Sequence, residues 1–310
     1  MLREAILSVV AQTDPHWRLV VVYDPVDGTH GTNLPHTPMD YVESSIADLI
    51  GDVSVPQATV VHLPMRMGPG WARNVGVDWA LAHGAPFVLF LDADDICEPS
   101  RLDRVTCAFE RHPRAGVVFN SFAVIDEESR FRKDSSLPGA IAEIVQTQST
   151  TDEVLSRPWQ LMACVRGYMS LTSTVAVRSE IARRCRFPHT HVSEDAHAWL
   201  RMFASSDEVI YLAERLTRYR VPQGPGVSSS RQRVGDSFYW TKALVDADAC
   251  ARVLIDEVAH GSMRASEAED VFDEFWRKMS STLARAGAIA PAAVAGGLSH
   301  KFPEGEIGTQ

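Results

Sequence analysis

The sequence predicts an α/β fold: a mixed, mostly parallel central sheet flanked by helices, followed by a C-terminal helical segment. Three observations support this prediction. The 310 residues are 45% hydrophobic, which is enough for one large core. Short apolar runs alternate with amphipathic stretches from residue 18 onward, as they do in βαβ units. Beyond residue 234 the apolar residues follow helical spacing only.

The first half of the chain alternates strand-like and helix-like segments. The opening residues have helical apolar spacing and Glu4 interrupts any signal-peptide start, so an amphipathic helix is predicted there. The segments that follow are RLVVVYD, DYVESSIADLI, ATVVHLP, GWARNVGVDWALAHG and FVLFLDADD. Uninterrupted Val and Leu in the first and last of these segments predict two central strands, covered on both faces.

The second half continues the mixed pattern. A helix is predicted from Pro99 to Arg111, then a strand in GVVFNSFAVID, and then a hairpin or mobile loop over 127–138. Further on, MSLTSTVAVR predicts a strand, SEDAHAWLRMFA a helix, and EVIYLAERLTRYRV a pair of strands.

These patterns divide the chain into four parts. An α/β domain over 1–221 is followed by a Gly/Pro/Ser-rich flexible loop over 222–234, a helical segment over 235–287 and a mobile tail over 288–310. One apolar stripe in the helical segment predicts a helix that covers either the main domain or a second protomer in a homodimer. The stripe consists of Val271, Phe272, Phe275, Trp276, Met279 and Leu283.

Charge and cysteine content exclude several partners. Forty acidic and thirty basic residues give a net charge of -10 without a long Lys/Arg run, so neither nucleic acid nor anionic lipid is expected as a partner. No apolar stretch approaches the ~20 residues of a membrane helix, so no membrane insertion is expected. The five cysteines are scattered without CxxC spacing, which indicates reduced thiols in a cytoplasmic protein.

Three acidic residues end the apolar run FVLFLDADD. Asp92, Asp94 and Asp95 should lie at the carboxyl edge of the sheet, where open α/β sheets bind ligands. Two carboxylates ~4 Å apart repel by ~4 kcal/mol at an effective dielectric near 20. Mg²⁺ or Mn²⁺ would relieve this repulsion while bridging to phosphate oxygens. The alternative is helix capping, with Asp95 accepting backbone N–H bonds ahead of the next helix.

Over about residues 2–221 the sequence resembles the family-2 glycosyltransferases with the GT-A fold. LREAILSVVAQTDPHWRLVVVYD resembles the first helix and following strand of that family, and GPGWARNVGVDWALAHGAPFVLFLDADD resembles the segment that ends in its Asp-x-Asp motif. SEDAHAWLRM is similar to the Glu-Asp element that carries the catalytic base, and Tyr219-Arg220 resembles a late Tyr-Arg pair before a flexible loop. The resemblance makes residues 1–221 a GT-A-like catalytic domain.

The resemblance also implies roles for individual residues. It makes Asp195 the catalytic base, with Glu194 as the reserve, and Asp94 the metal ligand, supported by Asp92 and Asp95. The donor-binding residues that it implies are Asp24, Arg73, Asn74 and Asp92.

The implied activity is transfer of a sugar from a nucleoside-diphosphate donor to an acceptor hydroxyl, with inversion and with Mn²⁺ or Mg²⁺. The acceptor is unknown. The chain lacks the Gln-x-x-Arg-Trp motif and membrane helices of processive members, so single-sugar transfer is expected. Two alternatives stay open: a sugar nucleotidyltransferase, or a truncated, non-catalytic protein that binds nucleotide or a partner.

One family element has no counterpart in this sequence. Family members begin with a strand that lies in the sheet between the equivalents of RLVVVYD and FVLFLDAD. Without it, two strand edges would lack hydrogen-bonding partners. We therefore expect the functional protein to have about a dozen or more extra residues upstream, in keeping with a strand and a turn.

Overall fold

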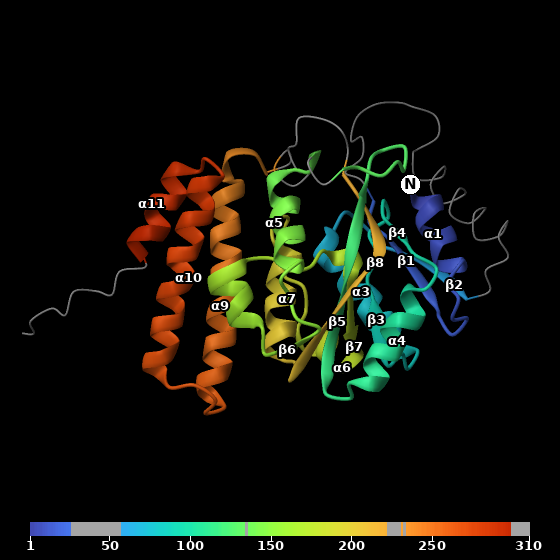
Figure 1. The fold of residues 1–310 in the computed structure, drawn as a ribbon, viewed down its shortest axis with the longest axis horizontal. Coiled ribbons are helices and arrows are strands. Elements are labelled where there is room, and N and C mark those ends of the chain that lie inside the picture. Colours follow the sequence, from blue (N-terminus) through green and yellow to red (C-terminus); the bar gives the residue numbers. More distant parts are fainter. Residues whose placement is uncertain (26–56, 134–135, 222–230, 232–233, 299–310) are drawn as a thin grey trace, which may run out of the picture.

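The Val-rich and Ile-rich runs form strands in two sheets (Figure 1). The structure is a computed structural model that describes residues 1–25, 57–133, 136–221, 231 and 234–298. In the smaller sheet, β1 (Leu19–Tyr23) pairs in parallel with β2 (Ala58–His62). The larger sheet has the order β3-β7-β5-β8-β4, with β6 beside β8. Its strands are β3 (Phe87–Leu89), β4 (Ile96–Cys97), β5 (Ala115–Ile125), β6 (Val154–Ser156), β7 (Val175–Arg178) and β8 (Glu208–Arg220).

Helices cover both sheets and form the C-terminal part. The helices of the α/β part are α1 (Leu2–Val10), α3 (Pro69–Ala82), α4 (Arg101–Arg111), α5 (Gly139–Gln148), α6 (Ser179–Arg184) and α7 (Glu194–Ala204). A π-helix η2 (Leu161–Arg166) and a 3₁₀ turn η3 (Thr172–Thr174) lie between them. After the short turn η4 (Gly235–Ser237), the C-terminal part consists of α9 (Phe238–Ala259), α10 (Ala265–Arg285) and α11 (Ile289–Leu298).

The predicted mixed sheet is confirmed, but its strands are mostly antiparallel. Among the described strands, only β1–β2 and β5–β8 pair in parallel. The predicted pair of strands in EVIYLAERLTRYRV is wrong, because β8 is one continuous strand whose register against β5 shifts near Ser121. The segment has no Gly, Asn or Pro to form a hairpin turn, so the extra residues are absorbed as a bulge.

The two strands expected at the centre of one sheet belong to different sheets. In the described part of the chain, β1 pairs only with β2, and β3 pairs only with β7. All residues of β1 and β3 are half-buried rather than fully covered. The expectation of an upstream strand between them stays a prediction. The helix expected in DYVESSIADLI lies outside the described residues.

Helix α3 connects the two sheets. A Cβ added at Gly76 would lie at ordinary contact distance from β1, 3.7 Å from Val22, so this face of the helix lies against the smaller sheet. The next residue, Val77, is buried in the main core beside β7 and α7 residues. Residues on the first turns of α3 are therefore placed relative to both sheets at once.

The C-terminal helices pack on the α/β part and share its main core. The residues of the apolar stripe on α10 contact that core, which realises the first alternative, a helix covering the main domain. Figure 1 shows α9, α10 and α11 side by side, with α7 between α9 and the sheet. Over the first part of the mobile tail expected at 288–310, α11 instead packs against α10, and Ala292 and Ala295 are buried. The rest of that tail, 299–310, lies outside the described residues.

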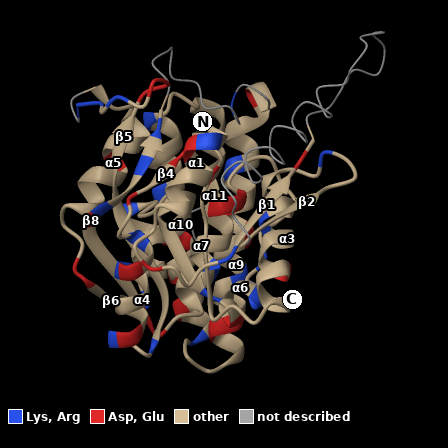
Figure 2. Cartoon of the chain, turned by 90° about the vertical axis from the view of Figure 1, so that its right-hand side faces the viewer, with Lys and Arg blue, Asp and Glu red and all other residues tan. Residues whose placement is uncertain are grey.

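The charged residues and the cysteines are scattered over the fold. Basic and acidic residues are interspersed in the view of Figure 2, without a face of one sign. None of the described helices has the length and apolarity needed to cross a bilayer. All five cysteines are free: Cys107 is half-buried, and Cys97, Cys164, Cys185 and Cys250 are buried.

Candidate active site

The acidic cluster lies on a turn that leaves the sheet after β3. The amide of Phe90 still donates to the carbonyl of Val175 on β7, at 3.1 Å. The amide of Asp92 donates to the hydroxyl of Ser173 at 2.9 Å, and the amide of Asp95 donates to the carbonyl of Asp92 at 3.1 Å. These bonds fix the backbone of the turn, so the positions of the carboxylates are built into the fold.

Asp92 and Asp94 are the accessible carboxylates of this turn. The side chain of Asp92 is 35% exposed, and Asp94 is exposed. Desolvation by the surrounding protein, followed by the charge of Asp92, raises the pKa of Asp94. A divalent cation would offset that repulsion, and carboxylate oxygens are ligands that Mg²⁺ and Mn²⁺ prefer.

A metal would need further ligands besides these two side chains. Within the described ranges, no group of three or more His, Cys, Asp and Glu residues could hold a metal ion. Mg²⁺ commonly binds through one or two carboxylates together with substrate phosphates and water. The pair Asp92 and Asp94 fits that kind of site, in which phosphate oxygens of a ligand and water would complete the coordination.

Asp95 faces the interior. The residue is fully buried, and its Oδ1 accepts a hydrogen bond from the amide of Arg220 at 2.7 Å. Its Oδ2 has no hydrogen-bond partner among the described residues. Burial raises the pKa of Asp95 to about 8. The structure thus places Asp95 in support of the turn, and its predicted contact with a metal stays a prediction.

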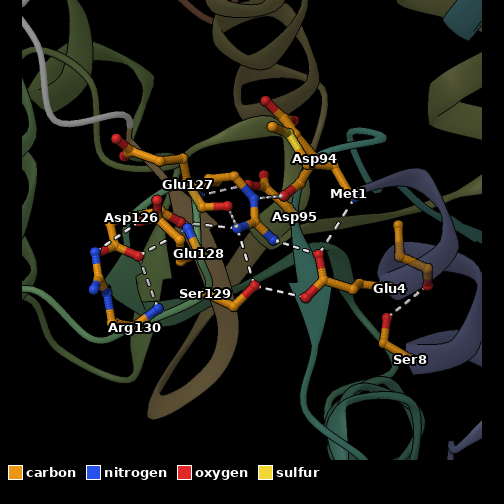
Figure 3. A network of polar contacts seen from close by, with 12 residues as sticks. Met1, Glu4, Ser8, Asp94, Asp95, Asp126, Glu127, Glu128, Ser129 and Arg130 are labelled. Carbon is orange, nitrogen blue, oxygen red and sulfur yellow. Dashed lines mark hydrogen bonds and ion pairs between the residues drawn. The ribbon is translucent and has the colours of Figure 1, made fainter.

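Arg220, the last residue of β8, fixes this turn by hydrogen bonds to Asp94 and Asp95. Its side chain is 1% exposed, and its Nε donates to the carbonyl of Asp94 at 2.7 Å. The two terminal nitrogens reach the carbonyl of Asp126, at 2.8 Å, and the carboxylate of Glu4 on α1, at 3.1 Å. Figure 3 shows this network around Glu4, Asp94 and Asp126. One buried guanidinium therefore joins three distant segments at the acidic turn.

Arg73 of α3 joins the acidic turn to α7. Its Nη2 lies 3.1 Å from Asp92 Oδ1, and its Nη1 lies 2.9 Å from Glu194 Oε1. Its side chain is 15% exposed and packs over the ring of Phe187. Burial alone would lower the pKa of Arg73, but the charges of Asp92, Glu194 and Asp195 raise it. The structure therefore brings Arg73, Asp92 and the Glu194-Asp195 pair together in one place.

Glu194 and Asp195 open α7 and differ in their surroundings. Glu194 is buried and bonded to Arg73, and burial followed by the charge of Asp195 raises its pKa. Asp195 is half-buried, and its Oδ1 accepts a hydrogen bond from the amide of Ala196 at 2.7 Å. Of the two carboxylates, Asp195 is therefore the one less enclosed by protein.

Two of the predicted donor-binding residues are bonded to backbone. Asp24, directly after β1, accepts hydrogen bonds from the amides of Met67 and Gly68, at 2.7 and 2.8 Å. Asn74 is buried, and its side-chain amide exchanges two hydrogen bonds with the backbone of Phe187, at 2.9 and 3.0 Å. Asn74 thus fixes the segment ahead of α7, and donor contact by either residue stays a prediction.

Two residues complete the site without standing out in the sequence. Burial raises the pKa of Tyr219, and the charges of Asp95, Asp92, Asp195 and Asp94 add to this effect, so the tyrosine lies among the site carboxylates. In the sequence, only the resemblance of Tyr219-Arg220 to the late Tyr-Arg pair of the family indicated that this tyrosine belongs to the site. Ser173, which bonds Asp92, lies within the strand-like run MSLTSTVAVR, where its polar neighbours Thr172 and Thr174 were the only hint.

The arrangement brings two kinds of chemistry together. Exposed carboxylates that repel each other can bind a cation and, through it, phosphate. A half-buried carboxylate a short distance away can accept a proton from a hydroxyl group. A buried arginine between them keeps its charge and can orient both sides.

Two glycosyltransferases are similar to this chain in sequence. An uncharacterised glycosyltransferase of Haemophilus influenzae is 25% identical over 76% of this chain and 75% of its own length. One of Methanocaldococcus jannaschii is 20% identical over 71% of this chain and 66% of its own.

Two solved structures share the fold. Staphylococcus aureus TarS matches 96% of this chain with a TM-score of 0.50 and 16% identity, and the chain spans 51% of that protein. The second is a mannosyltransferase from Pyrobaculum calidifontis in complex with GDP-Man and Mn²⁺. The match covers 94% of this chain and 82% of the mannosyltransferase chain, with a TM-score of 0.53 and 15% identity. These neighbours confirm the predicted GT-A-type fold.

The family profile described as glycosyl transferase family 2 matches residues 1–173, which is more than half of the sequence. The chain is therefore a glycosyltransferase and belongs to glycosyl transferase family 2.

Proposed function

We propose that this enzyme transfers one sugar from a nucleoside-diphosphate donor to an acceptor hydroxyl, with inversion at the anomeric carbon and with Mn²⁺ or Mg²⁺. The observation that carries the proposal is the position of Arg73. It bonds Asp92, on the predicted donor side, and Glu194, beside the predicted base. Donor and acceptor chemistry would thus take place around one guanidinium group.

Asp195 would accept the proton of the acceptor hydroxyl. The oxygen then attacks the anomeric carbon from the face opposite the diphosphate, the new glycosidic bond forms, and the nucleoside diphosphate leaves with the electrons of the broken bond. Attack from the opposite face inverts the configuration. Glu194 is less suited to this role because its carboxylate is buried and bonded to Arg73.

The departing diphosphate gains negative charge, and the protein must stabilise that charge where it develops. Asp92 and Asp94 would hold the divalent cation, which when bound supplies this stabilisation. Arg73 orients Asp92 and stays charged throughout. Ser173 and Arg220 fix the backbone of the turn, so little reorganisation is needed when the donor binds.

Isothermal titration with UDP, GDP and dTDP, with and without Mn²⁺, tests the proposal. The mannosyltransferase neighbour binds GDP-Man, so GDP-mannose is a natural first donor for hydrolysis and transfer assays. Asp94→Ala should abolish metal-dependent binding, whereas unchanged binding would remove Asp94 from the mechanism. Release of nucleoside diphosphate supports transfer, and release of pyrophosphate would support a sugar nucleotidyltransferase instead. Metal-independent binding without hydrolysis would favour the non-catalytic alternative.

A further inference from the structure

Ser193, the residue directly before Glu194 and Asp195, has an unfavourable backbone conformation. Its φ is +58°, in the left-handed region, where a residue with a side chain is strained. Serine at this position commonly caps the helix by accepting a hydrogen bond from its first turn. Here it makes no such cap. Its hydroxyl instead lies 3.2 Å from the hydroxyl of Tyr168 and 3.4 Å from Nζ of Lys242.

The partners of Ser193 form a buried polar cluster with the C-terminal helix α9. Lys242 and Asp246, one turn apart on α9, form an ion pair at 2.7 Å, and the hydroxyl of Tyr168 donates to the same Asp246 oxygen at 2.8 Å. Lys242 also bonds Tyr168 directly. The side chains of Lys242 and Asp246 are only 14% and 11% exposed. We call Tyr168, Lys242 and Asp246 the α9 cluster.

A second polar contact joins α7 and α9 one turn further along. Nε2 of the buried His197 lies 2.9 Å from Asp248, and Asp248 also binds Arg252 at 2.7 Å. The first two turns of α7 are therefore tied to α9 at two successive levels. Asp195 lies between these levels.

The composition of the α9 cluster is costly for a merely structural contact. A buried ion pair can often be replaced by apolar side chains of similar volume without loss of stability. In addition, Oδ1 of Asp246 is buried and has no hydrogen-bond partner among the described residues, which adds a desolvation cost. What the cluster supplies, and apolar packing could not, is one donor, Nζ of Lys242, and one acceptor, the hydroxyl oxygen of Tyr168, both directed at the Ser193 hydroxyl.

We propose that Tyr168, Lys242 and Asp246 are positioning residues for sugar transfer. They hold Ser193 in its left-handed conformation and thereby aim Asp195 and Glu194 at the acceptor and at Arg73. This inference rests on the proposed function, in which Asp195 takes the acceptor proton. It makes the C-terminal helical segment a working part of the active site.

Three single variants test the inference: Lys242→Met, Asp246→Asn and Tyr168→Phe. Each should lower kcat by about 10- to 100-fold, because small displacements of a reacting group are costly. The KM for the donor should change by less than about threefold, since the metal turn is untouched. Lys278→Met is the matched control, a partly buried lysine on α10, and should keep parental kcat. Equal effects of K242M and K278M on kcat would overturn the inference.

Replacing Ser193 with Gly gives a sharper test. Glycine adopts positive φ without strain, so the loop no longer needs a bonded hydroxyl to hold this conformation. In the S193G background, K242M should lower kcat by less than about threefold, in contrast to its larger effect in the parent. If K242M costs the same in both backgrounds, its effect does not run through Ser193, and the inference is wrong.

A measurement without turnover separates this inference from the proposed function. Hydrogen–deuterium exchange should show faster exchange at amides 193–198 in K242M than in K278M. Unchanged exchange there would overturn the positioning role even in an active enzyme. A parent protein that transfers no sugar would overturn the proposed function, while the exchange comparison would still decide whether the α9 cluster holds the start of α7.

Discussion

The guanidinium of Arg73 lies 2.9 Å from Glu194 and 3.1 Å from Asp92, so two residues that are 102 positions apart share one cation. This contact joins the acidic turn after β3 to the start of α7. It also explains why a buried Glu194 is tolerated, because an isolated buried carboxylate would be far more costly. The next four expectations concern this site and the elements that hold it.

Arg73→Lys should lower kcat/KM for transfer by about 100-fold. Lysine keeps the charge but cannot present two nitrogens to two carboxylates in a fixed fork. Arg183→Lys is the matched control, because two nitrogens of Arg183 bind the exposed Glu180, at 3.2 and 2.9 Å, on α6 and outside the site. Steady-state kinetics of both variants decide the matter, and an R73K enzyme as active as R183K would contradict the assignment.

Asp195→Asn should lower kcat by about 10²–10⁴-fold, the range expected for loss of a general base. Binding of the nucleotide with Mn²⁺, measured by titration calorimetry, should stay near the parental value. Glu194→Gln should have the smaller effect on kcat, since Glu194 contacts Arg73 rather than the acceptor in our proposal. The reverse order of the two kcat values would make Glu194 the base.

Gly70→Ala should destabilise the protein by about 1–3 kcal/mol, as overpacking does in a close contact. A Cβ at Gly70 would lie 2.4 Å from the carbonyl oxygen of Pro188, so α3 and the segment before α7 would have to separate. Gly139→Ala is the control, because a Cβ at Gly139 meets nothing within 4 Å. Urea unfolding of both variants measures the difference, and equal midpoints would show that the close approach is unimportant.

His197 should make stability depend on pH. Burial lowers its pKa, an effect that the hydrogen bond to Asp248 partly offsets. The unfolded chain therefore binds a proton more readily than the folded protein. The free energy of unfolding should be at its full value above the unfolded pKa of about 6.5 and should fall as the pH drops below it.

Urea unfolding at pH 7.5 and pH 5.5 tests this dependence. The loss of stability between the two pH values should be smaller in His197→Gln than in the parent. His16→Gln, at a side chain that is 89% exposed, should behave like the parent. Identical pH dependence in H197Q and the parent would assign the effect to other groups.

Local sequence patterns predicted the helices and strands well, but they predicted the contacts between distant segments less well. The acidic turn was predictable because an apolar strand that ends in Asp92 and Asp94 is unusual in itself. The pairing of Arg73 with Glu194 was not, because it depends on how α3 and α7 pack, which neither segment encodes alone. Asn74 shows the same limit: its backbone contacts to Phe187 are visible only once the two segments meet.

The C-terminal helices show a different limit. Their apolar stripe was predicted correctly, but helical spacing does not say which surface a stripe covers. Lys242 and Asp246 are one turn apart, a spacing that solvated ion pairs on exposed helix faces share. Only packing against α7 turned them into a buried contact of Ser193.

The buried thiols provide a built-in probe of local opening. A thiol reacts with an alkylating reagent only when it becomes accessible and deprotonated, so its labelling rate reports how often its surroundings open. Cys250 reports on the C-terminal helical part, and Cys97 and Cys185 report on the α/β part. Cys164 of η2 bonds the carbonyl of Val271 on α10 and reports on the contact between the two parts. Comparing these labelling rates by mass spectrometry would show, without engineered labels, whether the parts open together or one before the other.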